Sequence, residues 1–221
     1  MSRVPDPLTS DVGDKLLAIH RALDVAAIPH AFGGAIALAY AVADPRATND
    51  IDLNVAVSVD DAGRVVAALP DGITARPDVL DTIRKDGQDR LRWGDVPVDL
   101  FFPQHEFHAI VQARAGSQPF RNVTIPVITA TDLTVFKTLF DRTKDWADIE
   151  SMLRAGAVDV PEARRWVEAI LGTDHPGAIR LAGLAEEVRA HPDDEPGGVP
   201  TVWTRNGRQA SPGRVPSPPA R

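Results

Sequence analysis

Cysteine is absent from the 221 residues of this chain. A chain without thiols forms no disulfides, binds no zinc through thiolates and uses no cysteine nucleophile, and its composition agrees with a reducing compartment. Long apolar runs are missing too, because the longest, Ala35 to Ala43, is far shorter than the ~20 residues of a membrane-spanning helix. No apolar signal segment follows the first residues. We therefore expect a cytoplasmic protein with no membrane partner.

Positive charge is also scarce. Lys and Arg number 24 against 31 Asp and Glu, which gives a formal net charge of −7. A nucleic-acid partner would have to be met by a local basic patch, because the chain as a whole is acidic. The remaining composition, 43% hydrophobic and 25% charged, is that of an ordinary globular protein.

The order of the periodic segments predicts an α/β part over residues 1–128, followed by a small helical domain over 129–190. The predicted helices are 10–27, 35–42, 60–69, 131–142, 144–155, 161–171 and 176–189, and the predicted strands are 30–32, 50–59, 88–93 and 96–102. We expect a mixed sheet with flanking helices and a cleft between the two domains. Residues 191–221 hold 7 of the 19 prolines, so we expect a disordered Pro- and Arg-rich tail.

Two carboxylates stand at alternate positions in Asp50-Ile51-Asp52. In a strand they share one face, where their repulsion is tolerable if a divalent cation lies between them. Hard oxygen ligands of this kind suit Mg²⁺ together with substrate phosphates. Upstream, Gly33-Gly34 ends a strand and opens a helix, so unhindered backbone N–H groups can hold phosphate there.

A third acid, Asp99, interrupts the apolar strand Val96 to Phe101. Lone acids in such segments are uncommon. If this strand lies beside Asp50 and Asp52, Asp99 completes a triad that can bind a second metal ion or take a proton from an attacking hydroxyl.

Together these residues resemble the nucleotidyltransferase superfamily, which is built on the DNA polymerase β-like palm. Its members carry Gly-Gly or Gly-Ser at a helix start, Asp-x-Asp on the next strand and a third acid on a later strand. The run Arg46-x-Thr48-x-Asp50 is common in the bacterial branch, and Phe136 to Ile149 is similar to the branch of abortive-infection and MenT-type toxins. The resemblance spans about residues 28–155. Because Gly34 stands where relatives have serine, only a backbone contact to phosphate is expected there.

The resemblance implies transfer of a nucleoside monophosphate from a triphosphate such as ATP to an acceptor hydroxyl. The implied catalytic residues are Asp50, Asp52, Asp99 and Lys137, with the three acids binding Mg²⁺ or Mn²⁺. The implied nucleotide-binding residues are Gly33, Gly34, Arg46, Thr48, Lys137 and Asp148, with Asp145 as a weaker candidate than Asp148. A structural interpretation also stands, in which Lys137 is a surface residue paired with Asp141 four positions on.

Three interpretations of the function stay open. A toxin would modify a tRNA 3′ end, held by Arg84, Arg90 and Arg92, and would be regulated by a cognate antitoxin protein. An aminoglycoside-type enzyme would modify a polycationic small molecule, which an acidic cleft favours. A non-catalytic antitoxin or scaffold would keep the fold and bind a partner through residues 129–190.

Overall fold

The structure is a computed structural model that describes residues 10–44 and 48–192. Arg46 and the predicted tail from residue 193 onward lie outside the described residues. None of the helices in the described part is both long and apolar enough to cross a membrane.

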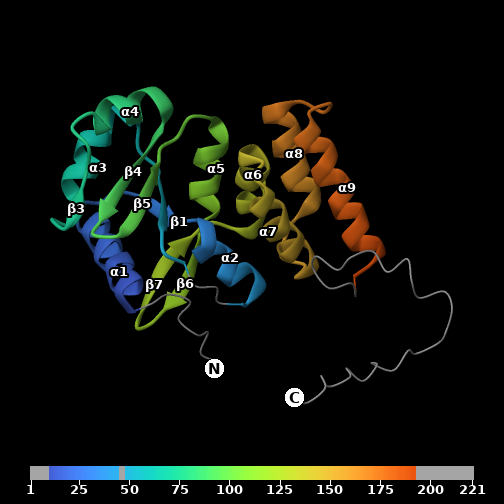
Figure 1. The fold of residues 1–221 in the computed structure, drawn as a ribbon, viewed down its shortest axis with the longest axis horizontal. Coiled ribbons are helices and arrows are strands. Elements are labelled where there is room, and N and C mark those ends of the chain that lie inside the picture. Colours follow the sequence, from blue (N-terminus) through green and yellow to red (C-terminus); the bar gives the residue numbers. More distant parts are fainter. Residues whose placement is uncertain (1–9, 45–47, 193–221) are drawn as a thin grey trace, which may run out of the picture.

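A mixed sheet forms the centre of the α/β part (Figure 1). Its strands are β1 (His30–Phe32), β2 (Ile51–Val55), β3 (Ile73–Thr74), β4 (Gln88–Trp93), β5 (Val96–Phe101), β6 (Gly116–Phe120) and β7 (Val123–Val127). They lie in the order β3-β4-β5-β2-β1-β7-β6. The pairs β2·β5 and β1·β7 are parallel, and the other neighbours are antiparallel. The mixed α/β sheet expected from the sequence is confirmed.

Helices flank the sheet and form the second part of the chain. Those of the α/β part are α1 (Ser10–Val25), α2 (Gly34–Val42), the 3-10 turn η1 (Val59–Asp61), α3 (Ala62–Ala68), α4 (Val79–Asp86) and α5 (Glu106–Arg114). The later ones are α6 (Ala130–Phe140), α7 (Thr143–Arg154), α8 (Val160–Leu171) and α9 (Pro176–Ala190). Figure 1 shows α6 to α9 gathered at one side of the molecule and the sheet at the other.

The helix ends follow from local capping. Thr129 accepts a hydrogen bond from the backbone N–H of Asp132, as the Thr-x-x-Asp pattern predicts. The α6 helix ends where Asp141 adopts a left-handed conformation with φ +52°, two residues earlier than predicted. Asp159 caps α8 ahead of Pro161, a residue that fits the first turn because its missing N–H has no helical partner there.

An ion-pair cluster joins the two parts. Arg114, the last residue of α5, binds Asp132 on α6, and its other terminal nitrogen lies 2.8 Å from Glu162 on α8. Asp132 is fully buried, and its carboxylate also accepts from the Thr129 hydroxyl at 2.7 Å. A buried carboxylate is stable only when it is paired, so this cluster holds α6 and α8 against α5.

The structure differs from the sequence prediction at several elements. The strand predicted over 50–59 ends at Val55, because the Ser58 hydroxyl accepts from the Asp60 N–H at 3.2 Å and turns the chain into η1. The hairpin of β6 and β7 and the helix α4 were not predicted. The β6 strand, Gly116–Phe120, contains Gly and Pro and lies at the edge of the sheet, where its weak strand pattern is tolerated.

Candidate active site

Three acids meet where two neighbouring strands run side by side. In the parallel pair β2·β5, Asp52 lies directly beside Asp99, and Asp50 comes immediately before β2. The alternate residues Ile51 and Leu53 are fully buried on the opposite face of the sheet. The apolar positions therefore fix the register that leaves the three carboxylates together on the other face of the sheet, where they are partly buried.

Two of these acids already have partners. Asp99 accepts two hydrogen bonds from Arg90 on β4, from Nε at 2.6 Å and from Nη2 at 2.7 Å. Asp50 accepts from the hydroxyl of Thr48 at 2.6 Å. Within the described residues, no side chain donates a hydrogen bond to the carboxylate of Asp52. Asp52 is therefore the acid whose negative charge is least compensated.

The electrostatics of Asp52 reflect this position. Burial, followed by the negative charges of Asp50 and Asp99, raises the pKa of Asp52 to about 6, and the more distant Lys137 and Arg142 offset only part of this effect. A charged Asp52 is thus unfavourable until additional positive charge is supplied.

Gly34 lies against this carboxylate at the first position of α2. Its φ is +51°, and a Cβ added there would come within 1.7 Å of Asp52 Oδ2. The preceding Gly33 donates its N–H to the Asp52 carbonyl oxygen at 3.0 Å. Glycine at position 34 is therefore required both by the backbone conformation and by the close approach of the acid. A serine would be strained here.

Lys137 on α6 is held inside a charged cluster. Its Nζ donates to Asp145 at 2.9 Å and to Asp148 at 2.7 Å, both on α7. Asp145 is fully buried and also accepts from Arg142 Nε at 2.6 Å. Burial would raise the pKa of Asp145, but the hydrogen bonds from Arg142 and Lys137 lower it.

The alternative in which Lys137 pairs with Asp141 on the surface is wrong. Lys137 is only 7% exposed, and the Asp141 carboxylate accepts instead from Trp146 Nε1 at 2.6 Å. Asp141 lies just beyond the end of α6, where its φ is +52°.

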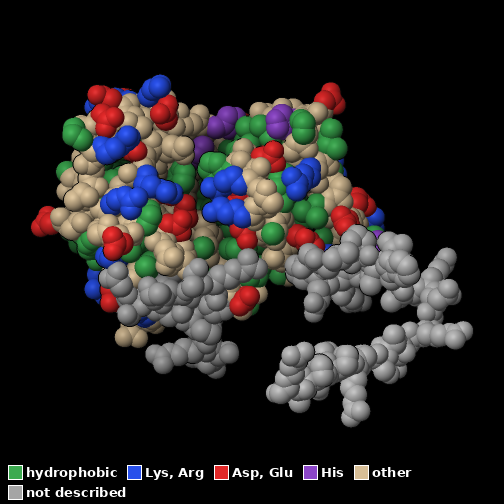
Figure 2. Space-filling model, in the orientation of Figure 1, with side chains coloured by type: hydrophobic (Ala, Val, Ile, Leu, Met, Phe, Trp, Pro, Cys, Tyr) green, Lys and Arg blue, Asp and Glu red, His purple; other side chains and the backbone are tan. Residues whose placement is uncertain are grey.

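A cavity of about 320 Å³ opens between the sheet and the helices α6 and α7. Its lining combines the acid cluster and Gly34 with Arg90, Lys137, Arg142, Lys144 and Asp148. The other wall is aromatic, since Phe101, Phe136 and Phe140 line it, and the ring centroids of Phe101 and Phe140 are 6.2 Å apart. Figure 2 shows Lys and Arg side chains on both sides of the junction between the two parts, with acidic side chains among them.

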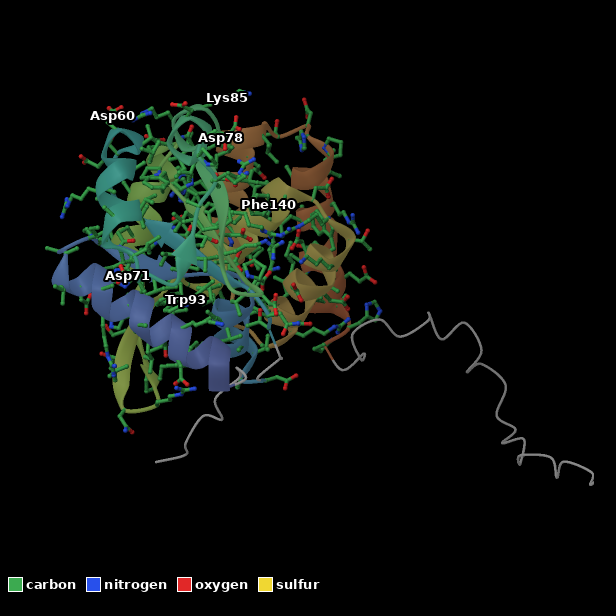
Figure 3. All side chains as sticks on the ribbon, turned by 60° about the vertical axis from the view of Figure 1, so that its left-hand side comes forward. Asp60, Asp71, Asp78, Lys85, Trp93 and Phe140 are labelled. Carbon is green, nitrogen blue, oxygen red and sulfur yellow. The ribbon has the colours of Figure 1, made fainter. Side chains whose placement is uncertain are left out.

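The structure separates several sequence candidates from this cavity. Thr48 is 5% exposed and acts on Asp50 rather than on the cavity. Arg84 pairs with Asp81 at 3.1 Å on α4. Neither Arg84 nor Arg92 lines this cavity, whereas Arg90 does. Of the two aromatic residues labelled in Figure 3, Phe140 lines the cavity and Trp93 does not.

Sequence reasoning missed the phenylalanine wall. No spacing rule singles these residues out, because Phe101 is on β5 and the others are on α6. In the toxin interpretation Arg90 is a residue that holds a tRNA 3′ end, whereas in the structure it binds Asp99. The antiparallel register, in which Arg90 lies opposite Asp99, is the only signal for this pair.

The chemistry of the acid cluster fits a divalent cation. Three carboxylates border one cavity, and burial together with the negative charges of Asp50 and Asp99 raises the pKa of Asp52. Such an all-oxygen donor set suits Mg²⁺. Within residues 10–44 and 48–192, however, one group of three His or acidic residues has ligand atoms that all lie within 4.8 Å of one another. That group lies outside this cavity, at His20, Asp24 and His30. Asp50, Asp52 and Asp99 do not form such a group, and Asp99 is paired with Arg90.

This sheet and its helices form a nucleotidyltransferase-like fold. The solution structure of the antibiotic-resistance factor ANT(2″)-Ia matches with a TM-score of 0.53 and 13% sequence identity, over 82% of this chain and 99% of that chain. The same factor in complex with adenylyl-2″-tobramycin gives a TM-score of 0.47 at 14% identity, over 82% and 98% of the two chains. A nucleotidyltransferase-like protein from Paracoccidioides brasiliensis gives 0.46 at 19% identity, over 84% and 91%. No protein-family model matches the sequence, and no curated protein matches it significantly.

Proposed function

We propose that this protein is a Mg²⁺-dependent nucleotidyltransferase that moves a nucleoside monophosphate from a triphosphate to a hydroxyl group. The observation that carries this proposal is the pairing of Asp52 with Asp99 beside Asp50, at the mouth of a cavity that also contains cationic and aromatic side chains. The acids suit a metal bound to phosphate, the cations suit the phosphates themselves, and the aromatic wall suits a base. The fold shared with ANT(2″)-Ia agrees with this class of reaction.

Each group has a proposed role in the transfer. The acceptor oxygen bonds to the α-phosphorus, the bond from that phosphorus to the bridging oxygen breaks, and pyrophosphate leaves with the electron pair. Asp50 and Asp52, with Asp99 beside them, would hold Mg²⁺, which neutralises charge on the phosphoryl oxygens when bound. Asp99 orients the acceptor hydroxyl and receives its proton, with Arg90 fixing the direction of the carboxylate.

The phosphate side of the cavity is served by two features. Gly33 and Gly34 present the start of α2, where the N–H groups at a helix N-terminus attract anions. Arg142 and Lys144 on α7 supply positive charge at the opposite wall. Lys137 also lines the cavity, but its bonds to Asp145 and Asp148 make it a positioning residue that holds α7, and with it Arg142, against α6.

A cationic small molecule is the acceptor that we favour. Asp86 joins Asp50, Asp52 and Asp99 on the cavity wall, and an acidic wall attracts a polycation such as an aminoglycoside. A tRNA 3′ end is the second candidate, because the exposed Arg142 and Lys144 offer local positive charge for a nucleic-acid backbone. In that case the protein would act as a toxin with a cognate antitoxin.

The test is transfer of radiolabel from each of the four α-labelled triphosphates with Mg²⁺, to an aminoglycoside panel, to total tRNA and to protein. Asp52→Asn should lower transfer by at least about 100-fold, because it removes a charged group at the reacting phosphate. It should also raise stability at pH 7 by about 1–3 kcal/mol, since the raised pKa means that the charged form is unfavourable in the folded protein. The contribution of Asp52 to the stability of the wild type falls as pH rises from 3.8 toward about 6, and this contribution should be absent in the variant.

The matched control is Asp86→Asn, which changes an exposed acid at the rim of the same cavity. Its transfer to tRNA should be near wild type, whereas transfer to a polycationic acceptor should show a raised KM. Equal transfer by wild type and Asp52→Asn would remove the catalytic role of Asp52. A stable protein complex with no transfer to any acceptor would favour a non-catalytic scaffold.

A further inference from the structure

Two buried histidines and an aspartate form a cluster away from the active-site cavity. His20 and Asp24 lie one turn apart on α1, and His30 is the first residue of β1. His20 is 9% exposed and His30 is 3% exposed, whereas the Asp24 side chain is 61% exposed. None of the three lines the active-site cavity, so the mechanism above makes no use of them.

Hydrogen bonds fix the two rings against each other, with one nitrogen of each ring facing the other ring. His30 Nδ1 lies 2.9 Å from the carbonyl oxygen of Ile28. A carbonyl only accepts, so this nitrogen carries the proton and Nε2 is left with a lone pair. His20 Nδ1 lies 2.9 Å from that Nε2, and His20 Nε2 lies 3.4 Å from Asp24 Oδ2.

We propose that His20, Asp24 and His30 form a binding site for a divalent transition-metal ion, with Zn²⁺ as the probe. One ligand atom from each residue lies within 4.8 Å of the others. Imidazole nitrogen with one carboxylate oxygen is a donor set that Zn²⁺ accepts, with water completing the coordination. The exposed Asp24 side chain leaves an opening through which ion and water enter.

Further features agree with this assignment. A metal-bound histidine usually donates its other ring N–H to a carbonyl or carboxylate, and the bond from His30 to Ile28 has that form. Mg²⁺, which prefers oxygen ligands, does not suit this nitrogen-rich site, so the two metal sites are chemically distinct.

The proposed site would stabilise β1, the strand that leads into Gly33 and Gly34 of the active site. The ring of Phe32 makes edge contacts with both histidine rings, at centroid distances of 6.5 and 5.9 Å, and Phe32 directly precedes Gly33. An ion that ties α1 to β1 would therefore rigidify the strand that ends at the phosphate-binding turn. Its expected effect is on stability, with no part in the transfer reaction itself.

The test is a titration of the full chain, without a histidine tag, with Zn²⁺ in a large excess of Mg²⁺, read by competition with a chromophoric chelator. We expect saturation at one equivalent and an increase in Tm. Asp24→Asn should weaken binding by about 10-fold or more, and His20→Gln should abolish it. Because Asp24 is exposed, Asp24→Asn keeps the test valid even if a histidine variant fails to fold.

The control is His191→Gln, which removes an exposed histidine at the end of α9 and should bind like the wild type. An absence of saturable binding in the wild type would overturn the proposal. Equal Zn²⁺ affinity in the wild type and Asp24→Asn would also overturn it, because the ion would then be bound elsewhere. The two rings would in that case be joined only by the hydrogen bond between His20 and His30.

Discussion

The role of Lys137 can be tested by replacing it with methionine, which is similar in length but uncharged. The variant removes the cation that lies 2.9 Å from Asp145 and 2.7 Å from Asp148. Asp145 is fully buried, so it cannot turn to water when its partner is lost. Asp145 does keep its bond from Arg142 at 2.6 Å, which limits the loss of stability.

The expected loss follows from these contacts. Removing one partner of a buried ion pair costs about 3–5 kcal/mol, and the remaining Arg142 bond reduces this to about 2–4 kcal/mol. For a chain of this size, each kcal/mol lowers Tm by about 2–4 °C, so Lys137→Met should melt roughly 5–15 °C below the wild type. Urea unfolding followed by tryptophan fluorescence measures the change, because Trp146 is buried on the same helix as Asp145.

Lys144→Met is the matched control, because Lys144 is exposed on α7 and should change stability by no more than about 0.5 kcal/mol. In the double variant Lys137→Met with Asp145→Asn, the losses should be less than additive, since the two changes remove the same interaction. A loss below about 1 kcal/mol in Lys137→Met would refute the structural reasoning. A lysine that served only the triphosphate would instead leave stability unchanged and raise KM.

Further predictions concern a glycine and an acid. Gly34→Ala should lose activity and about 1–3 kcal/mol of stability, because its Cβ would collide with Asp52. Gly94 also has a positive φ, +61°, but a Cβ added there would meet nothing within 4 Å. Thermal unfolding of Gly94→Ala should therefore show only the smaller cost of backbone strain. Glu162, whose pKa is lowered from 4.5 to about 2 by hydrogen bonds from Arg165 first and then Arg114, should stabilise the fold above pH 4.5 and lose this contribution as pH falls toward 2. Urea midpoints of Glu162→Gln should therefore fall less steeply with acid than those of the wild type, and parallel curves would contradict this.

Local patterns predicted much of the fold. The capping box at Thr129, the prolines that open α8 and α9 and the alternation in β5 act over a few residues, so they can be recognised in the chain. The β6·β7 hairpin could not be found in this way, because its strands are stabilised by pairing with each other and with β1. The same limit applies to the boundary of β2, where a single hydrogen bond at Ser58 outweighs the apolar residues that follow.

The candidate site shows the same division. Asp50, Asp52 and Asp99 stand out in the sequence because charge interrupts apolar strands, and Gly33-Gly34 because glycine breaks a strand before a helix. The residues that bind these and the neighbouring acids cannot be recognised in the sequence. The bonds from Arg90 to Asp99 and from Lys137 to Asp145 join residues on different elements, and so does the pair of His20 and His30.

The sequence by itself therefore determined which residues carry charge on which faces, and with them the class of chemistry that we propose. Only the tertiary structure decided which charges are already compensated and which remain available. Compensation depends on distances of a few ångströms between separate helices and strands, and these distances arise when the apolar faces of the sheet and of α6 and α7 pack together.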